Sequence, residues 1–371
     1  MTKLRRFLLS GSGWPYLLVP FILVAVVLDF VVHADATVIF ATSALGVIPT
    51  AALMGRATEE LSARSGPGIG GLLNVTFGNA PELIIAIFAL IEGLNEVVKA
   101  SIVGSILGNI LLVMGAAMLI GGLSRERQTF DATAASAQAS MLLLAVAALV
   151  SPAIYQLVSG GGLPAPNATI VDFPPEVEQL SFGVAIILLI SYAGGLLFSL
   201  KTHKDLFNPE RGEEEHGEPW SVKKAVVLLA VAGVAVGLMS EILVGSITEA
   251  SKSIGLSQFF VGVIVVAIVG NAAEHWVAIY FATKDKMDIS VNIAIGSSAQ
   301  IALFVAPVLV LLSFVVGDVP LALEFNGFEL GGIVLAILIA DHVARDGMST
   351  WFEGLQLLSV YAVLGLTFFF V

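Results

Sequence analysis

The sequence predicts an all-α polytopic membrane protein with eleven transmembrane helices, and three observations support this fold class. Hydrophobic residues make up 57% of the chain and charged residues only 12%, about half the charge of a typical soluble domain. The apolar residues fall into runs of about 20, long enough to cross a hydrocarbon core about 30 Å thick. The Lys and Arg residues are distributed unevenly among the segments that connect these runs.

The apolar runs predict eleven spans, with boundaries good to about three residues. They cover residues 14–32, 36–56, 68–91, 97–122, 133–158, 180–200, 223–243, 257–283, 287–316, 327–345 and 350–370. The first run follows Lys3, Arg5 and Arg6, as the core of a cleaved signal peptide would. It is too long for such a core, so we expect a retained first helix.

The basic residues predict the orientation of the spans. With a cytoplasmic N-terminus, all 17 Lys and Arg residues except Lys99 and Lys252 fall in cytoplasmic segments, as the positive-inside rule requires. The C-terminus then lies on the opposite side. We expect a multi-pass protein of a cell membrane.

Composition also excludes several classes of function. The net charge of −12 and the lack of a basic stripe exclude nucleic-acid binding. The absence of cysteine excludes disulfides and thiolate metal sites. No HExxH pair or nucleophilic cysteine is present, so we expect neither an enzyme nor catalytic residues. The expected partners are the lipid bilayer and small ions, with no cofactor; a homo-oligomer is left open.

An internal repeat organises the chain. Gly78-Asn79-Ala80-Pro81-Glu82 recurs 192 residues later as Gly270-Asn271-Ala272-Ala273-Glu274, and the same offset carries Gly104-Ser105 onto Gly296-Ser297. The motifs lie on the third and the eighth predicted spans, and because these differ by an odd number the copies cross the membrane in opposite directions. Inverted repeats of this kind place the substrate near mid-membrane, between the repeats.

The repeat predicts four regions. They are an N-terminal segment with one extra helix (1–35), a first five-helix repeat (36–200), an acidic cytoplasmic linker (201–222) and a second five-helix repeat (223–371). The linker carries Glu210, Glu213, Glu214, Glu215 and Glu218. A solvated hinge is the favoured interpretation, and a regulatory site for divalent cations is the alternative.

Glu82 and Glu274 carry the functional prediction. A carboxylate at the centre of a span costs several kcal/mol and is a functional candidate for that reason. We expect no Lys or Arg inside the spans to neutralise them, so a bound cation or protons must do so. The two glutamates are therefore predicted to hold a transported cation.

The neighbouring residues favour a hard cation. Asn79 and Asn271 lie three residues before the glutamates and share a helical face with them. Gly78, Gly270 and Pro81 weaken the helices locally, and a broken helix frees carbonyl oxygens for ion binding. Calcium takes six to eight oxygen ligands of these kinds, whereas magnesium keeps its water and fits less well.

Other polar residues are assigned to the transport pathway or left open. Buried amides need partners, so a lining role is favoured over packing for Asn109 and Gln300, whereas Gly104 and Gly296 are interpreted as packing residues. The remaining predicted pathway residues are Gly78, Gly270, Ser105, Gln138, Ser297 and Ser298. The acids near span ends are portal or proton sites, or merely interfacial: Glu59, Glu60, Glu241 and Glu249. His275 is a packed histidine, a proton relay or a ligand of the cation.

These segments carry a family resemblance. GNAPELIIAIFAL and GNAAEHWVAI resemble the paired motifs of the calcium/proton exchangers, the cation/proton exchanger branch of the calcium/cation antiporter superfamily. GSILGNILLVMG, GSSAQIALFVAPV and DGMSTWFEGLQLL resemble the same branch, so the likeness covers nearly the whole chain. The sodium/calcium branch commonly has serine or threonine where Asn79 and Asn271 stand, which argues against sodium coupling.

The resemblance implies a function and roles for the residues. It makes Glu82 and Glu274 calcium ligands and protonation sites, Asn79 and Asn271 helpers, and Ser105, Ser297, Ser298 and Gln300 lining residues. The implied activity is exchange of calcium for protons by alternating access, in a secondary transporter. Exchange of manganese, sodium-coupled calcium exchange and a passive cation channel are the alternatives; the inverted repeat favours a carrier over a channel.

Overall fold

The part of the chain that the structure describes is almost entirely helical, which confirms the predicted all-α fold class. The structure is a computed structural model and describes residues 13–65, 70, 72–73, 76–166, 174–202, 220–317 and 319–371. Ten helices among these residues are long and apolar enough to cross a membrane, and Ala80–Ile91 is a shorter apolar helix. The predicted span 68–91 lies partly outside the described residues, so the count of eleven stays a prediction.

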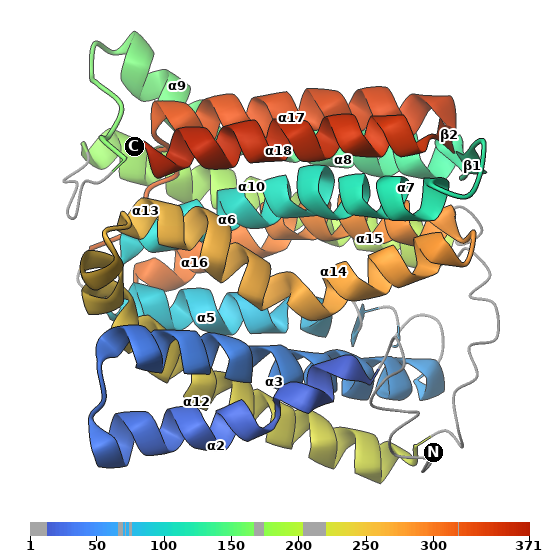
Figure 1. Cartoon of the computed structure of the whole chain (residues 1–371). Coiled ribbons are helices and arrows are strands. Elements are labelled where there is room, and N and C mark those ends of the chain that lie inside the picture. The colour runs from blue at the N-terminus through green and yellow to red at the C-terminus, as the bar shows by residue number, and fades with distance from the viewer. Residues whose placement is uncertain are drawn as a thin grey trace. The chain divides into compact units, whose positions relative to one another are not determined.

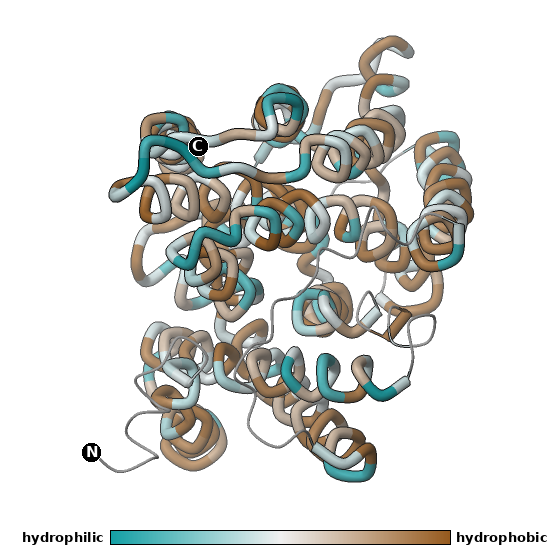
Figure 2. Tube along the Cα trace, turned by 90° about the vertical axis from the view of Figure 1, so that its right-hand side faces the viewer, coloured by the Kyte–Doolittle hydropathy of each residue, from teal (hydrophilic) through white to brown (hydrophobic). Residues whose placement is uncertain are grey.

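The long helices turn large apolar side chains outward, as lipid contact requires. Leu23 and Val31 of the first span are each 71% exposed, and Val234 is 75% exposed. Hydrophobic residues make up most of each long helix (Figure 2). A soluble protein rarely leaves so much contiguous apolar surface in water, so these faces fit a bilayer.

The chain folds as two compact units, each built from separate stretches of sequence. Unit 1 comprises Met1–Phe88, Leu196–Leu256 and Val269–Val277. Unit 2 comprises Ala89–Gly195, Ser257–Ile268 and Ala278–Val371. The four predicted regions follow the sequence repeat and stay a prediction. Most of the predicted acidic linker (201–222), namely residues 203–219, lies outside the described residues.

Unit 1 is built around one long helix, α3 (Ala36–Arg64), against which α2 (Pro20–Val27) and α12 (Val222–Ile254) both pack (Figure 1). Its core contains Met54, Ala80, Ala232 and Val236. The unit also includes η1 (Trp14–Leu18), η2 (Leu28–Val32), most of α5 (Ala80–Ile91), the end of α10 (Pro175–Leu197), η4 (Phe198–Thr202) and the middle of α14 (Ala267–Thr283).

The ends of these helices follow from local chemistry. The Asp35 side chain accepts a hydrogen bond from Thr37 N at 2.9 Å and caps α3. Ser221 caps α12 in the same way, and α12 ends at Gly255, which has a φ of 72°. Because hydropathy measures only the apolar length of a span, the predicted end at residue 243 falls eleven residues short of Ile254, the last residue of α12.

Unit 2 pairs its helices along their lengths: α18 (Trp351–Phe369) packs on α7 (Met114–Gly122), and α17 (Gly327–Asp346) packs on α8 (Ala132–Leu149) (Figure 1). Two short strands, β1 (Gln128–Thr129) and β2 (Met348–Ser349), pair antiparallel. The other elements are α6 (Asn95–Leu107), η3 (Gly108–Val113), α9 (Ser151–Val158), most of α10, α13 (Gln258–Phe260), η5 (Val261–Val266), α15 (Met287–Gln300), η6 (Ile301–Val305) and α16 (Ala306–Ser313).

A close helix crossing inside unit 2 explains one glycine of the repeat. A Cβ atom added at Gly104 of α6 would lie 2.0 Å from the carbonyl oxygen of Val263 in η5. That separation is far inside van der Waals contact, so only glycine fits. The structure therefore confirms the packing interpretation of Gly104.

Candidate cation site

Glu82 lies at the start of α5, just after a break in the helical backbone. A turn at Asn79 precedes the helix, and its carbonyl oxygen accepts a hydrogen bond from Leu83 N at 3.1 Å. Pro81 has no N–H, so it cannot donate to the carbonyl of Phe77, four residues earlier. The proline thus removes one hydrogen bond from the helical ladder just before the first glutamate.

Glu274 lies inside a continuous helix. Gly270, Asn271 and Glu274 all belong to α14, which runs without interruption from Ala267 to Thr283. Ala273 stands where the first copy has Pro81 and keeps its N–H, so the helical ladder continues. The two copies of the motif share residue types but differ in backbone.

The two copies meet inside unit 1, each glycine beside the glutamate of the other copy. A Cβ atom added at Gly270 would lie 3.4 Å from Cγ of Glu82. One added at Gly78 would lie 3.9 Å from Oε1 of Glu274. The two carboxyl groups are close enough to interact electrostatically, so the fold brings together the two acids that the repeat predicts.

The surroundings of the two acids are poor in water. Asn79 is 1% exposed and Asn271 is 0% exposed. Glu82 and Glu274 are partly exposed, but Oε2 of Glu82 is buried and accepts no hydrogen bond from any described residue. A buried carboxylate oxygen without a donor is destabilising by about 1–3 kcal/mol or more, so this pair favours a state in which protons or a cation neutralise it.

The ligand chemistry available here is oxygen from two acids and neutral groups. Within the described part of the chain, no three His, Cys, Asp or Glu side chains are arranged to hold a metal ion. Asn79 and Asn271 lie one helical turn from the glutamates and bring amide oxygens to the same region. A cation held here would rely on these amides and on backbone carbonyls in addition to the two carboxylates.

The structure separates the other predicted acids of unit 1. Glu60 is buried, and its Oε2 accepts a hydrogen bond from Trp220 N at 3.0 Å. Its neighbour Glu59 is exposed, as are Glu241 and Glu249 on α12. Glu60 therefore holds the residue that precedes the cap of α12. This contact between residues 160 positions apart left no signal in the sequence.

His275 is a third buried polar residue near the two glutamates, in addition to Asn79 and Asn271. Only 8% of its surface is exposed, and it follows Glu274 directly on α14. Consecutive helical residues point about 100° apart, so its position on the helix differs from that of the glutamate. Its role as a packed residue, a relay or a ligand stays a prediction.

Apart from Gly78 and Gly270, the predicted pathway residues belong to unit 2. Ser105, Asn109, Ser297 and Ser298 are each 9% exposed or less, while Gln300 is partly exposed. Ser298 Oγ donates to Ala294 O at 2.8 Å, within its own helix. The lining role stays a prediction.

Gln138 of α8 has a partner that the sequence analysis missed. Its Nε2 donates to Oδ1 of Asn292 on α15. A Cβ atom added at Gly296, one turn further along α15, would lie 3.5 Å from Oε1 of Gln138. In the sequence, only the position of Asn292 one helical turn before Gly296 could have indicated that it belongs to this polar contact.

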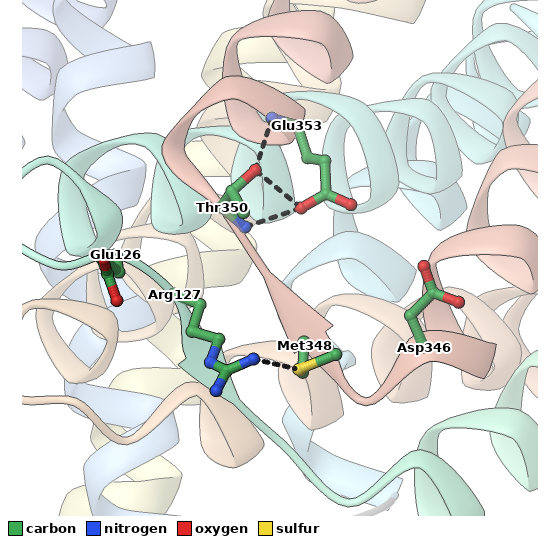
Figure 3. Close-up of a pocket in the computed structure, with 6 residues that line it drawn as sticks. All are labelled: Glu126, Arg127, Asp346, Met348, Thr350 and Glu353. Carbon is green, nitrogen blue, oxygen red and sulfur yellow. Dashed lines mark hydrogen bonds between the residues drawn. The ribbon is translucent and has the colours of Figure 1, made fainter.

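A separate pocket of about 290 Å³ lies beside the β1–β2 pair in unit 2 (Figure 3). Thr350 N and Oγ1 both donate to Glu353 Oε2, at 2.6 and 2.9 Å. Arg127 reaches Met348 Sδ at 3.6 Å. The remaining residues that line the pocket are Glu126 and Asp346. The pocket contains none of the predicted cation ligands, so it is not the candidate site.

Comparison with known proteins adds a family and close relatives. The family described as sodium/calcium exchanger protein matches residues 35–201 and 224–370. The Ca(2+)/H(+) antiporter of Aphanothece halophytica is 44% identical over 352 residues, which are 91% of this chain and 91% of the relative. The Ca(2+)/H(+) antiporter ChaA of Bacillus subtilis (strain 168) is 44% identical over 359 residues, 94% of this chain and 98% of that one.

A solved structure supports the same architecture. The structure of native YfkE is similar to this chain with a TM-score of 0.80 and 40% sequence identity. The match covers 96% of this chain and 100% of that one. The likeness therefore extends over both units and over both copies of the motif.

Proposed function

The chain belongs to the sodium/calcium exchanger protein family, and we propose that it is a secondary antiporter that exchanges calcium for protons. Two relatives that match it over more than nine tenths of its length, those of Aphanothece halophytica and Bacillus subtilis, carry the name Ca(2+)/H(+) antiporter. The observation that carries the proposal is the meeting of Glu82 and Glu274 in unit 1, each beside the glycine of the other copy.

Charge balance is the physical basis of the exchange. Two carboxylates in a water-poor site require two positive charges, because an uncompensated charge is strongly disfavoured there. One calcium ion supplies two, and so do two protons. The two forms of the site are alternatives, so a rise in calcium releases protons and a rise in protons releases calcium. Exchange at this site is electroneutral, at one calcium ion for two protons.

Neutral oxygens complete the calcium form. The Oε2 atom of Glu82 is buried and accepts no hydrogen bond from the described residues, so it is available to a cation. Asn79 and Asn271 supply amide oxygens, and the break before α5 supplies the carbonyl of Phe77. Calcium accepts such an irregular set of oxygens, whereas magnesium requires near-ideal octahedral geometry.

Access to the site alternates between the two sides of the membrane. The motif copies lie on oppositely directed spans of the predicted inverted repeat, and transporters of this kind move one repeat or bundle against the other around a fixed site. We assign Ser105, Asn109, Gln138, Ser297, Ser298 and Gln300 to the pathway. Glu59, Glu241 and Glu249, which are exposed, serve as its portal.

The protein lies in a cell membrane with its N-terminus in the cytoplasm. The distribution of Lys and Arg supports this orientation, since only Lys99 and Lys252 fall on the other side. The C-terminus then lies opposite the cytoplasm. Exchange driven by an inward proton gradient across this membrane exports calcium.

Calcium uptake into proteoliposomes tests the proposal. The vesicles are loaded at acidic pH and diluted into alkaline medium containing calcium, with the membrane potential clamped. Wild-type protein is expected to take up calcium in proportion to the proton gradient. Glu82→Gln and Glu274→Gln are each expected to reduce uptake to the level of empty vesicles, because one carboxylate cannot balance a divalent ion.

The control is Glu126→Gln, which removes an exposed acid of the unit 2 pocket and is expected to leave uptake unchanged. Proton-driven uptake that survives in either Gln variant of the pair would refute the assigned site. Uptake that follows a sodium gradient or the voltage and ignores pH would instead overturn the proton coupling.

A further inference from the structure

Lys99 of α6 is buried inside unit 2, with only 1% of its surface exposed. Its Nζ lies 2.6 Å from Oε1 of Glu96 and donates to the backbone carbonyl of Glu324 at 2.8 Å. The expectation that no Lys or Arg lies inside the spans is therefore wrong for α6. The ion pair and the carbonyl replace the water that an ammonium group otherwise needs.

Three buried carboxyl groups interact with this one ammonium group, and the Glu96 carboxyl contacts it directly. Glu96 is 9% exposed, Glu324 is 1% exposed and Glu329 is 0% exposed. Glu324 and Glu329 both interact electrostatically with Lys99 and with Glu96. With all three acids ionised, the cluster would carry two uncompensated negative charges away from water, which is strongly unfavourable.

Each acid also has an oxygen that no donor reaches. Glu96 Oε2, Glu324 Oε2 and Glu329 Oε1 are buried and accept no hydrogen bond from the described residues. The other oxygen of Glu329 accepts from Asn326 N at 2.8 Å, as part of the capping box that starts α17. The orphaned oxygens are positions at which protons would be stabilised.

No further positive charge comes from the elements packed against this cluster. Of the elements that pack on α6 and α17, none of α8, α13, α15, η3, η5 and η6 contains a Lys, Arg or His residue. Asp288 lies at the start of α15, where its carboxylate accepts from Asp131 N. The remaining charged residues of α17 lie in its last two turns: Asp341, His342, Arg345 and Asp346.

Three further acids near this segment, among the residues that the structure describes, reach water at least in part. Ser181 of α10 accepts a hydrogen bond from Leu323 N at 2.9 Å, which places the start of α10 beside the segment that carries Glu324. On that helix Glu176 is exposed and Glu178 is partly exposed, and Glu92, before α6, is exposed as well. Protons are the counter-charge that the orphaned oxygens of the three acids can bind directly.

We propose that Glu96, Glu324 and Glu329 hold one or two protons around Lys99, as a proton-binding site built entirely within unit 2. The site fastens the segment 319–326 to α6. A second contact joins the same two elements, because Asn95 Nδ2 of α6 donates a hydrogen bond to Val319 O at 3.2 Å. Loss of the protons leaves uncompensated charge under this segment and loosens it. The site is thus a pH-dependent fastening, independent of the exchange carboxylates.

Glu324 lies in the segment between two spans, and the pKa of its carboxyl group determines how the stability of the site depends on pH. Burial raises the pKa of its carboxyl group above 4.5, Lys99 opposes the rise, and Glu96 adds to it. Since the folded protein binds a proton that the unfolded chain releases, the associated stability is full at low pH. It is lost as the pH rises through the folded-state pKa.

Infrared spectroscopy of protonated carboxyl groups tests the proposal directly. The full chain carrying both Glu82→Gln and Glu274→Gln serves as the background, so the exchange carboxyls contribute nothing. At neutral pH this background is expected to show a protonated-carboxyl band. Adding Glu324→Gln or Glu329→Gln is expected to reduce the band by at least one carboxyl group.

Glu353→Gln is the matched control, because Glu353 occupies the same capping-box position at the start of α18 but is partly exposed. It is expected to leave the band unchanged. A background without the band, or a band that neither Glu324→Gln nor Glu329→Gln reduces, would overturn the proposal.

Thermal unfolding gives a second readout. It uses only the Glu324→Gln variant, so it does not require the variant Glu329→Gln, which loses a capping contact of α17, to fold. Glu324→Gln keeps the backbone carbonyl that Lys99 contacts. In the background, the unfolding temperature is expected to fall as the pH rises from about 6 to about 9, and Glu324→Gln is expected to flatten that fall. An equal fall with and without Glu324→Gln would count against the site.

Discussion

The two copies of the repeated motif place the same residue types on different backbones. Around Glu82 the helix is interrupted at Asn79, and α5 starts afresh at Ala80. Around Glu274 the helix α14 continues through the motif. The one substitution between the copies is Pro81 against Ala273, and the absence of the proline N–H accounts for the difference.

The difference shows that the site depends on the reciprocal packing of the copies more than on their backbone symmetry. Each glycine lies beside the opposite glutamate although only one copy is broken. The continuous copy keeps its helical hydrogen bonds, and the broken copy lacks the one that Pro81 cannot donate. Variants that exchange the proline between the copies, or that remove an asparagine or a glycine from one copy, measure how much each feature contributes to calcium uptake.

The largest difference is expected from exchanging the proline. Ala273→Pro removes the hydrogen bond from residue 273 to the carbonyl of Val269 and introduces a ring clash, at a cost of about 3 kcal/mol or more. We expect strongly reduced uptake and a lower unfolding temperature. Pro81→Ala restores a donor and is expected to reduce uptake only several-fold. Equal effects of the two variants on uptake would show that the backbone difference has no role.

An intermediate effect is expected from the asparagines. Asn79→Ala and Asn271→Ala each remove one neutral oxygen but no charge. We expect calcium affinity to fall about tenfold, on the order of one lost charge-assisted contact of about 1.5 kcal/mol, with proton coupling retained. Calcium titration of uptake at fixed pH measures the change. A loss as complete as that of the glutamate variants would show that the asparagines have more than a helping role.

The smallest effect is expected from the glycines. An added methyl group at Gly270 meets Cγ of Glu82 at 3.4 Å, whereas one at Gly78 meets Oε1 of Glu274 only at 3.9 Å. Both distances are ordinary contacts, so both Ala variants are expected to fold. Gly270→Ala is expected to slow uptake more than Gly78→Ala, because it restricts the Glu82 side chain. The reverse order in initial uptake rates would contradict the packing described at the site.

Much of the fold and the centre of the site could be predicted because their causes are local. Apolar run length predicts the spans, and a carboxylate in an apolar run, repeated with its flanking Gly and Asn, predicts the site. The end of α12 was missed because its last eleven residues are helical but too polar to register as membrane-spanning. Gly255 ends that helix through its backbone conformation.

The rest of the polar network depends on tertiary contacts that no local pattern encodes. Glu59 and Glu60 are adjacent and chemically alike, yet only Glu60 is buried against Trp220. Lys99 looks like a boundary residue until Glu324, 225 residues away, accepts its hydrogen bond. Such pairs are found only when the packing of distant helices is known.

Proton release on calcium binding tests the central claim most directly. Calcium is titrated into the purified protein in weakly buffered solution, and the protons released are counted. The charge balance at Glu82 and Glu274 predicts up to two protons released for each calcium ion bound, and neither binding nor release in Glu82→Gln or Glu274→Gln. Calcium binding without proton release, or binding that persists with both glutamates replaced, would contradict it.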